Sequence, residues 1–162
     1  MGEFGTLILL AHGTETDPPD VSGTVREANL ASLQARDAAS VLNEAKISPD
    51  VIYTATSDSR FADMVMAALR VLPRRVVTDS RLNTSLNDRD NEDSHAMQQI
   101  HEFYTDEIVF GLLRRETLVI VADESIIRAA RIVLNVDPDL AALSIYTYDR
   151  YLRPTSEATT AR

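Results

Sequence analysis

The chain contains no cysteine and no tryptophan, and basic residues are scarce relative to acidic ones. Without cysteine it cannot hold a disulfide, a thiol nucleophile or a Cys-ligated zinc or iron–sulfur site. Its 16 Lys and Arg stand against 25 Asp and Glu, which gives a net charge of −9. Because nucleic acids and anionic membranes are bound by basic surfaces, we expect neither as a partner.

Long apolar runs are also missing. The longest, residues 6–11 and 118–122, are far too short to span a bilayer, and no signal-peptide pattern opens the chain. We therefore expect a cytoplasmic protein. A length of 162 residues predicts one domain over residues 6–152. Residues 1–5 are expected to be a cloning remnant or flexible start, and residues 153–162 a flexible polar tail.

Short β-branched runs alternate with longer stretches of helical period. Strands are predicted at residues 6–10, 51–54, 75–78, 117–121 and 143–148. Helices are predicted at residues 25–46, 61–72, 95–115 and 125–134. This alternation indicates an α/β fold, a three-layer α/β/α arrangement with a mostly parallel sheet of about five strands.

The strand at 143–148 alternates between polar and apolar residues, which is typical of a sheet edge. An edge strand can pair with its own copy, so this segment predicts a homo-oligomer. Tyr146 and Tyr148 share one face of the strand, where they are expected to pack, while an aromatic edge for a partner is the alternative.

Candidate site residues follow the strands, because ligands of an open parallel sheet bind outside the carboxyl ends of its strands. His12-Gly13-Thr14 follows the first strand, Ser59-Arg60 follows the second, and Asp123 follows the strand at 117–121. We therefore expect one histidine, one arginine and several carboxylates to converge at one edge of the sheet.

Three of these segments carry a resemblance. Residues 7–15, LILLAHGTE, resemble the opening of the histidine phosphatase (phosphoglycerate mutase-like) superfamily, an apolar strand followed by Arg-His-Gly. Residues 50–60 are similar to its second motif, a strand followed by a Ser-rich turn and an arginine. Residues 117–128 resemble its last motif, a strand followed by His-Gly and a helix. The length is closest to short members such as the phosphohistidine phosphatases.

The resemblance implies roles for individual residues. His12 matches the nucleophile that attacks phosphorus and becomes phosphohistidine. Gly13, Thr14, Ser59 and Arg60 match the stretch that binds the substrate phosphate, although the family's arginine aligns with Ser59 and Arg60 comes one residue late. No metal and no cofactor are expected.

Three positions depart from the family pattern. Ala11 stands where the family has arginine, Asp123 stands where it has its second histidine, and Asn83 falls near its acid glutamate. The resemblance then implies a decayed phosphate pocket: a pseudophosphatase that acts as a binding or scaffolding module. Its partners would be another protein, a second copy of the chain or a phosphorylated ligand.

Other roles stay open for the same residues. In a divergent phosphohydrolase, His12 attacks, Arg60 holds the phosphate, and Asp123 or an acid of a loop donates the proton. Alternatively, His12 is a hydrogen-bonded structural histidine, Arg60 pairs with a nearby aspartate such as Asp58, Asp63 or Asp123, and Asp123 caps the helix that follows it.

Two metal-related patterns are weaker. The acidic stretch 88–93 lacks the glycine and the final glutamate of a calcium loop, so solvated charge explains it better. The run from Ala11 to Thr14 also resembles the entry of small tetrapyrrole metal chelatases, in which a histidine binds the incoming metal, but the later motifs fit that family poorly. His95 and His101 are six residues apart on one expected helix, which does not suit a ligand pair.

Overall fold

The computed structural model describes the backbone of residues 5–12, 23–56, 59–83, 92–136, 143–148, 152 and 154–159, and side chains for most of them. The strands are β1 (Thr6–His12), β2 (Val51–Thr54), β3 (Arg75–Thr78), β4 (Thr117–Asp123), β5 (Leu143–Tyr148) and β6 (Pro154–Thr159). The helices are α1 (Gly23–Glu44), α2 (Ser59–Ala68), η2 (Ser80–Leu82), α3 (Glu92–Phe103), η3 (Tyr104–Ile108), α4 (Val109–Leu113) and α5 (Glu124–Val133).

All of the strands belong to one sheet, in the order β3-β2-β4-β1-β5-β6. The four strands from β3 to β1 run parallel to one another. β5 is antiparallel to β1, and β6 is antiparallel to β5. The expectation of an α/β fold with a mostly parallel sheet is confirmed.

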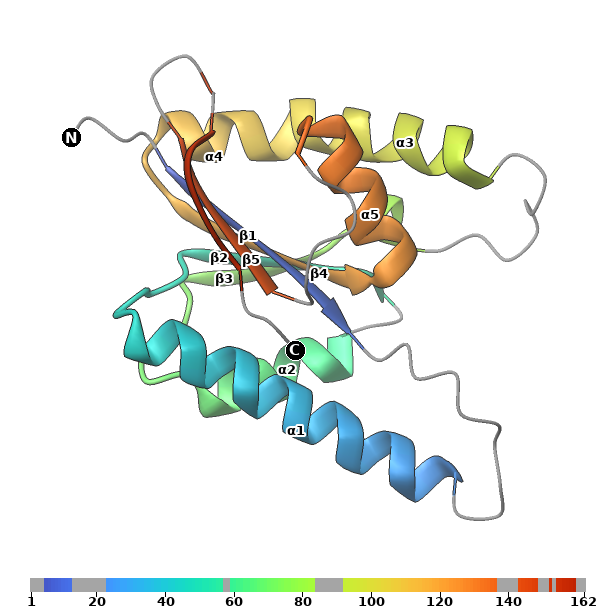
Figure 1. Ribbon diagram of the computed structural model, residues 1–162, viewed down its shortest axis with the longest axis vertical. Helices are drawn as coiled ribbons and strands as arrows, with labels where there is room; N and C mark the ends of the chain where they lie inside the picture. The colour runs from blue at the N-terminus through green and yellow to red at the C-terminus, as the bar shows by residue number, and fades with distance from the viewer. Residues whose placement is uncertain are drawn as a thin grey trace.

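Helices cover both faces of the sheet, with α1 and α2 on one side and α3, α4 and α5 on the other (Figure 1). The side chains of β1 alternate between the two layers. Ile8 and Leu10 pack with the helices α1 and α2, whereas Leu7 and Leu9 pack with α3, α4 and α5. All four are buried, as a parallel strand covered on both faces requires. The predicted three-layer arrangement is therefore confirmed.

The C-terminal part of the sheet differs from the expectation. Residues 154–159, expected to lie in a flexible tail, form β6 and pair with β5. β5 is consequently an inner strand with partners on both sides. The prediction that β5 is a sheet edge through which a homo-oligomer forms is therefore wrong. The residues of β6 are mostly small or polar, and such an edge strand lacks the apolar alternation from which strands are predicted. Tyr146 and Tyr148 are buried and pack in the core, as expected.

The helix predicted over residues 95–115 is interrupted. It is continuous in space, but a π-helical turn, η3, lies between α3 and α4. One such turn adds a residue to the helical repeat and changes which side chains face the sheet, and it is frequent at functional sites. Among the described helices, none is both long and apolar enough to cross a membrane.

Gly5, the residue before β1, lies close to the backbone of α4 and of the residues that follow it. A Cβ at this position would lie 2.8 Å from the Cα of Leu112 and 2.9 Å from the carbonyl oxygen of Glu116. Both are backbone atoms, so no side-chain rotation can relieve the contact. The backbone of Gly5 also accepts a hydrogen bond from the N–H of Tyr148, which fixes β5 beside β1.

We expect Gly5→Ala to lower the free energy of unfolding by about 1–3 kcal/mol, the usual cost of overpacking. Urea denaturation followed by circular dichroism measures it. Gly23→Ala is the matched control, because it adds the same methyl group at the first residue of α1, where alanine favours the helix. Equal stabilities of the wild type and Gly5→Ala would contradict the close approach.

Candidate functional site

The two residues expected to carry the chemistry lie side by side in the backbone. His12 is the last residue of β1 and Asp123 is the last residue of β4, and they are register partners across the parallel pair. Both strands are central in the sheet, and the α5 helix begins directly after Asp123 (Figure 1). The sheet thus brings these two positions together at its carboxyl edge, as the sequence predicts.

Asp123 is the N-cap of α5. Its Oδ1 accepts a hydrogen bond from the backbone N–H of Ile126 at 3.1 Å and another from the hydroxyl of Ser125 at 2.7 Å. Its backbone is extended, with φ of −72° and ψ of 169°, as an N-cap requires. The capping role is confirmed, and a catalytic role for Asp123 stays a prediction.

The other predicted site residues are placed less fully. Ser59 and Arg60 open the first turn of α2, and the side chain of Arg60 is exposed. Arg60 forms no ion pair with Asp63 or Asp123 among the described contacts, so those two pairings are not observed. Gly13 and Thr14 lie outside the described residues, as do Asp58 and most of the acidic stretch 88–93.

Asn83, which stands near the family's acid position, is bonded to the loop after β2. Its Oδ1 accepts the backbone N–H of Thr56 at 2.9 Å, and its Nδ2 lies 2.7 Å from the Thr56 hydroxyl oxygen. These contacts join the segments that follow β2 and β3 at the carboxyl edge. An amide has no proton to give at neutral pH, so Asn83 holds two segments together and is not a general acid.

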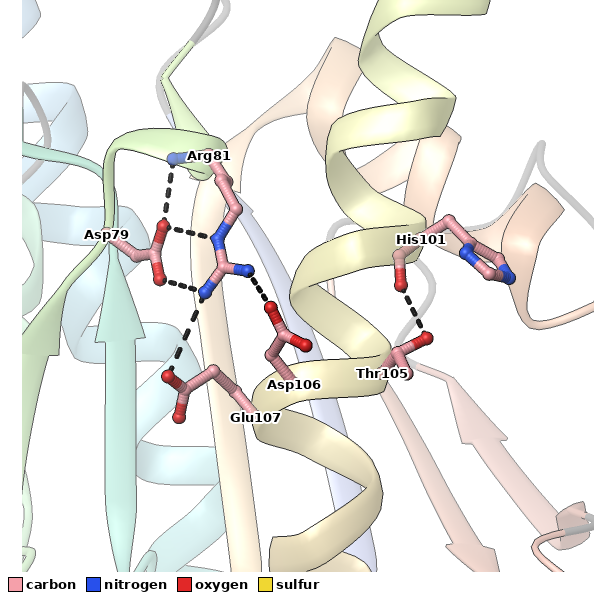
Figure 2. Close-up of polar contacts among 6 residues, drawn as sticks. All are labelled: Asp79, Arg81, His101, Thr105, Asp106 and Glu107. Atoms are coloured by element: carbon pink, nitrogen blue, oxygen red, sulfur yellow. Dashed lines mark hydrogen bonds and ion pairs between the residues drawn. The ribbon is translucent and has the colours of Figure 1, made fainter.

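A second polar cluster lies at the carboxyl end of β3, around Arg81 (Figure 2). Asp79 accepts three hydrogen bonds from Arg81, from its backbone N–H at 2.9 Å, from Nε at 3.0 Å and from Nη2 at 2.8 Å. Nη1 of Arg81 donates to Asp106 at 2.8 Å, and Glu107 is 3.8 Å from Nη2. Both of these acids belong to the π-helical turn η3.

The guanidinium of this cluster also packs against an aromatic pair. The guanidinium of Arg81 lies 5.4 Å from the ring centre of Phe103, which itself meets Tyr53 edge to face. Arg81 is not among the residues that the sequence points to. The available signal is the Asp-x-Arg spacing directly after a strand, but the π-helical turn that aims Asp106 at Arg81 has no recognisable sequence pattern.

Hydrogen bonding changes the protonation of the cluster. The bonds from Arg81 hold the pKa of the Asp79 carboxyl below its ordinary value of 3.8, although burial opposes them. Bonding to Asp79 likewise raises the pKa of Arg81. Both groups stay charged across the physiological range, so the guanidinium is committed to carboxylates and is poorly placed to hold a phosphate.

No group of three or more His, Asp and Glu side chains is arranged to hold a metal ion in the described part of the chain. His101 lies on α3 with its ring turned away from the Arg81 cluster (Figure 2). Its backbone carbonyl accepts a hydrogen bond from the Thr105 hydroxyl at 2.9 Å.

Comparison with known proteins gives the fold. No family model matches the chain, and no curated protein matches it in sequence. Among solved structures, it is similar to phosphoglycerate mutase from Plasmodium falciparum (14% identity, 98% of this chain and 89% of that one, TM-score 0.58). It is also similar to a mycobacterial glucosyl-3-phosphoglycerate phosphatase (19% identity, 96% and 97%, TM-score 0.58).

A third similar structure is the protein histidine phosphatase SixA in complex with tungstate (11% identity, 95% of this chain and 96% of that one, TM-score 0.56). The near-complete coverage in both directions matches the compact size that the sequence indicates. The chain therefore has the fold of the histidine phosphatase superfamily.

The cap generates the first prediction at this site. We expect Asp123→Ala to lower the free energy of unfolding by about 0.5–2 kcal/mol, because the Ile126 N–H loses its acceptor. Asp123→Ser, which restores a capping oxygen, should recover most of that loss in the same urea titration. If the serine variant is as unstable as the alanine variant, the cap is not what Asp123 contributes.

The Arg81 cluster generates a pH prediction. A carboxyl with a lowered pKa in the folded state stabilises the fold above its unfolded pKa and loses this effect as the pH falls through the folded value. Asp79→Asn should therefore cost on the order of 2 kcal/mol at pH 7, with the difference from the wild type shrinking as the pH falls below 3.8.

Urea denaturation at a series of pH values measures this difference. Asp106→Asn is the control, because the Asp106 side chain is 63% exposed and its ion pair should contribute little. A cost of Asp79→Asn that stays constant from neutral to acid pH would show that its charge does not matter.

Proposed function

We propose that this chain is a pseudophosphatase, a histidine phosphatase-like domain that binds a partner or ligand and does not turn over phosphate esters. The observation that carries the proposal is the position of Asp123. It is the register partner of His12, at the place where the resemblance implies a second histidine, and its carboxylate is bonded within the start of α5.

Charge gives the first reason. Family chemistry passes through a phosphoryl group whose oxygens carry negative charge, and it needs cationic or N–H donors around them. A carboxylate about 4 Å from such a charge costs on the order of 4 kcal/mol at an effective dielectric of 20. Asp123 at this edge therefore opposes the transition state that a histidine would stabilise.

Ala11 gives the second reason. It occupies the place of the family's first arginine, and its side chain packs against the core beneath α5. Losing one preorganised donor costs about 2.7–4 kcal/mol in the transition state. Together with the Asp123 term, the expected loss corresponds to a rate factor of about 10⁵.

Neither nearby arginine offers an obvious replacement. Arg60 is exposed on the first turn of α2, where its side chain is not held by packing. Arg81 donates hydrogen bonds from Nε, Nη1 and Nη2 to carboxylates. Arg81 therefore supports the fold, and Arg60 is not held in place for phosphate transfer.

The retained strand-end layout favours binding over a purely structural role. His12 and the start of α5 lie at the carboxyl edge of the sheet, where proteins of this architecture receive ligands. SixA, which has the same fold, is seen with tungstate, an oxyanion of phosphate-like shape. A phosphorylated ligand or a protein segment is therefore the class of partner that we propose for this edge.

We expect purified protein to hydrolyse p-nitrophenyl phosphate and phosphohistidine no faster than His12→Ala does. His101→Ala is the matched control, since His101 lies on α3 and not on the segments after β1 and β4 that carry the predicted site. Steady-state assays with both substrates measure the rates. Turnover that His12→Ala abolishes and His101→Ala leaves intact would overturn the proposal and favour a divergent phosphohydrolase acting through His12.

A further inference from the structure

One edge of the sheet is open. β3 is the last strand in the sheet order, and the pairings of the described residues join it to β2 alone. The backbone N–H of Arg75 donates to the carbonyl of Asp50, the residue before β2. The backbone N–H of Asp79 donates to the carbonyl of Thr54, the last residue of β2. Because successive residues of a strand point their backbone groups to opposite sides, those of Val76 and Thr78 point outward.

The side chains along this edge are exposed. Arg75 and Thr78 are exposed, and Val76 is 40% exposed although it lies in the middle of the strand. Val71 and Leu72, in the connection that leads to β3, are 55% and 68% exposed. Unpaired backbone groups beside exposed apolar side chains are what a further strand would cover.

We infer that β3 pairs antiparallel with β3 of a second copy of this chain, so that the two sheets become one. The outward residues decide the register. Val76 of each copy lies opposite Thr78 of the other, which uses the N–H and C=O groups of both residues in both chains. Val77 then meets its own copy on the two-fold axis, as a self-complementary interface requires.

Neighbouring registers are worse. Moving the axis to Val76 would place Thr78 opposite Arg74, whose backbone N–H already donates to Asp50 at 2.9 Å. Moving it to Thr78 would place Val76 opposite Ser80, which begins the 3-10 turn η2 and is not extended. Only the register centred on Val77 satisfies all of the outward groups of the strand.

Charge selects a second copy as the occupant. In this register Arg75 lies directly opposite Asp79 of the other chain. Arg75 is exposed and forms no ion pair with a described residue. Near Asp79 the cluster holds three carboxylates against the single guanidinium of Arg81, and Asp106 is 63% exposed.

The start of β3 has the opposite balance. Arg74, Arg75 and Arg114 gather there around two carboxylates, Asp50 and Glu116. An antiparallel two-fold arrangement places the basic start of each strand against the acidic end of the other. A strand with one basic and one acidic end is thus complementary to its own reversed copy.

Sedimentation velocity of the full chain over a range of protein concentrations tests the inference. We expect the wild type to shift from 17.9 kDa toward twice that mass as its concentration rises. Val76→Pro should remain at the mass of one chain, because proline removes an outward N–H and leaves every hydrogen bond to β2 in place. Val76→Thr is the matched control and should still dimerise, since it keeps the N–H and the β-branch.

Arg75→Glu provides a second variant at an exposed side chain that has no ion pair with a described residue, where a substitution should leave the fold intact. It should raise the dimer dissociation constant at least tenfold, and the wild-type constant should rise with salt. A wild type that is monomeric at every concentration would overturn the inference, and so would a dimer that persists in Val76→Pro. The outcome is independent of the phosphatase assays, because neither His12 nor Asp123 takes part.

Discussion

The parallel pairing of β1 with β4 is the contact on which the rest of the structure depends. The pairing runs from Thr6 opposite Thr117 to His12 opposite Asp123 without a shift. Its lower end is fixed by polar contacts: the Thr6 N–H donates to the carbonyl of Glu116 at 3.1 Å, and the Thr117 N–H donates to the carboxylate of Asp50 at 2.8 Å. Because both strands are buried on both faces, a slip of one residue would reverse every core side chain.

That register fixes the positions of different polar residues at the two ends of the β1–β4 pair. At the lower end, the buried carboxylate of Glu116 is bonded by Arg74 at 2.7 Å and by Arg114 at 2.9 Å, so burying its charge is compensated. At the upper end the same register sets His12 beside Asp123. A carboxylate there stabilises the start of α5 and repels an anion, whereas a histidine would do the reverse. Under the proposed function, Asp123 stabilises the start of α5 and disfavours oxyanion binding.

How far the sequence predicts this structure follows from how local each signal is. β2 and β3 occur at the predicted residues, because dense β-branched runs between turns leave little choice of conformation. The cap at Asp123 could also be predicted from a local signal, because the aspartate stands between a predicted strand and a predicted helix. β6 could not be predicted, since its residues form a strand by pairing with β5 and their sequence has no apolar alternation. The π-helical turn could not be predicted either, because it has no recognisable sequence pattern.

The excess of acidic residues takes on a different meaning once the residues are placed in space. A net charge of −9 spread evenly would keep copies of the chain apart. Along β3, however, the charges are sorted, with Arg74 and Arg75 at its start and Asp79 beyond its end. Short-range complementarity of this kind acts within a Debye length of about 8 Å at physiological salt, where the repulsion between distant charges is screened. An acidic chain can thus pair with its own copy through charges that are complementary at contact, although its net charge opposes self-association.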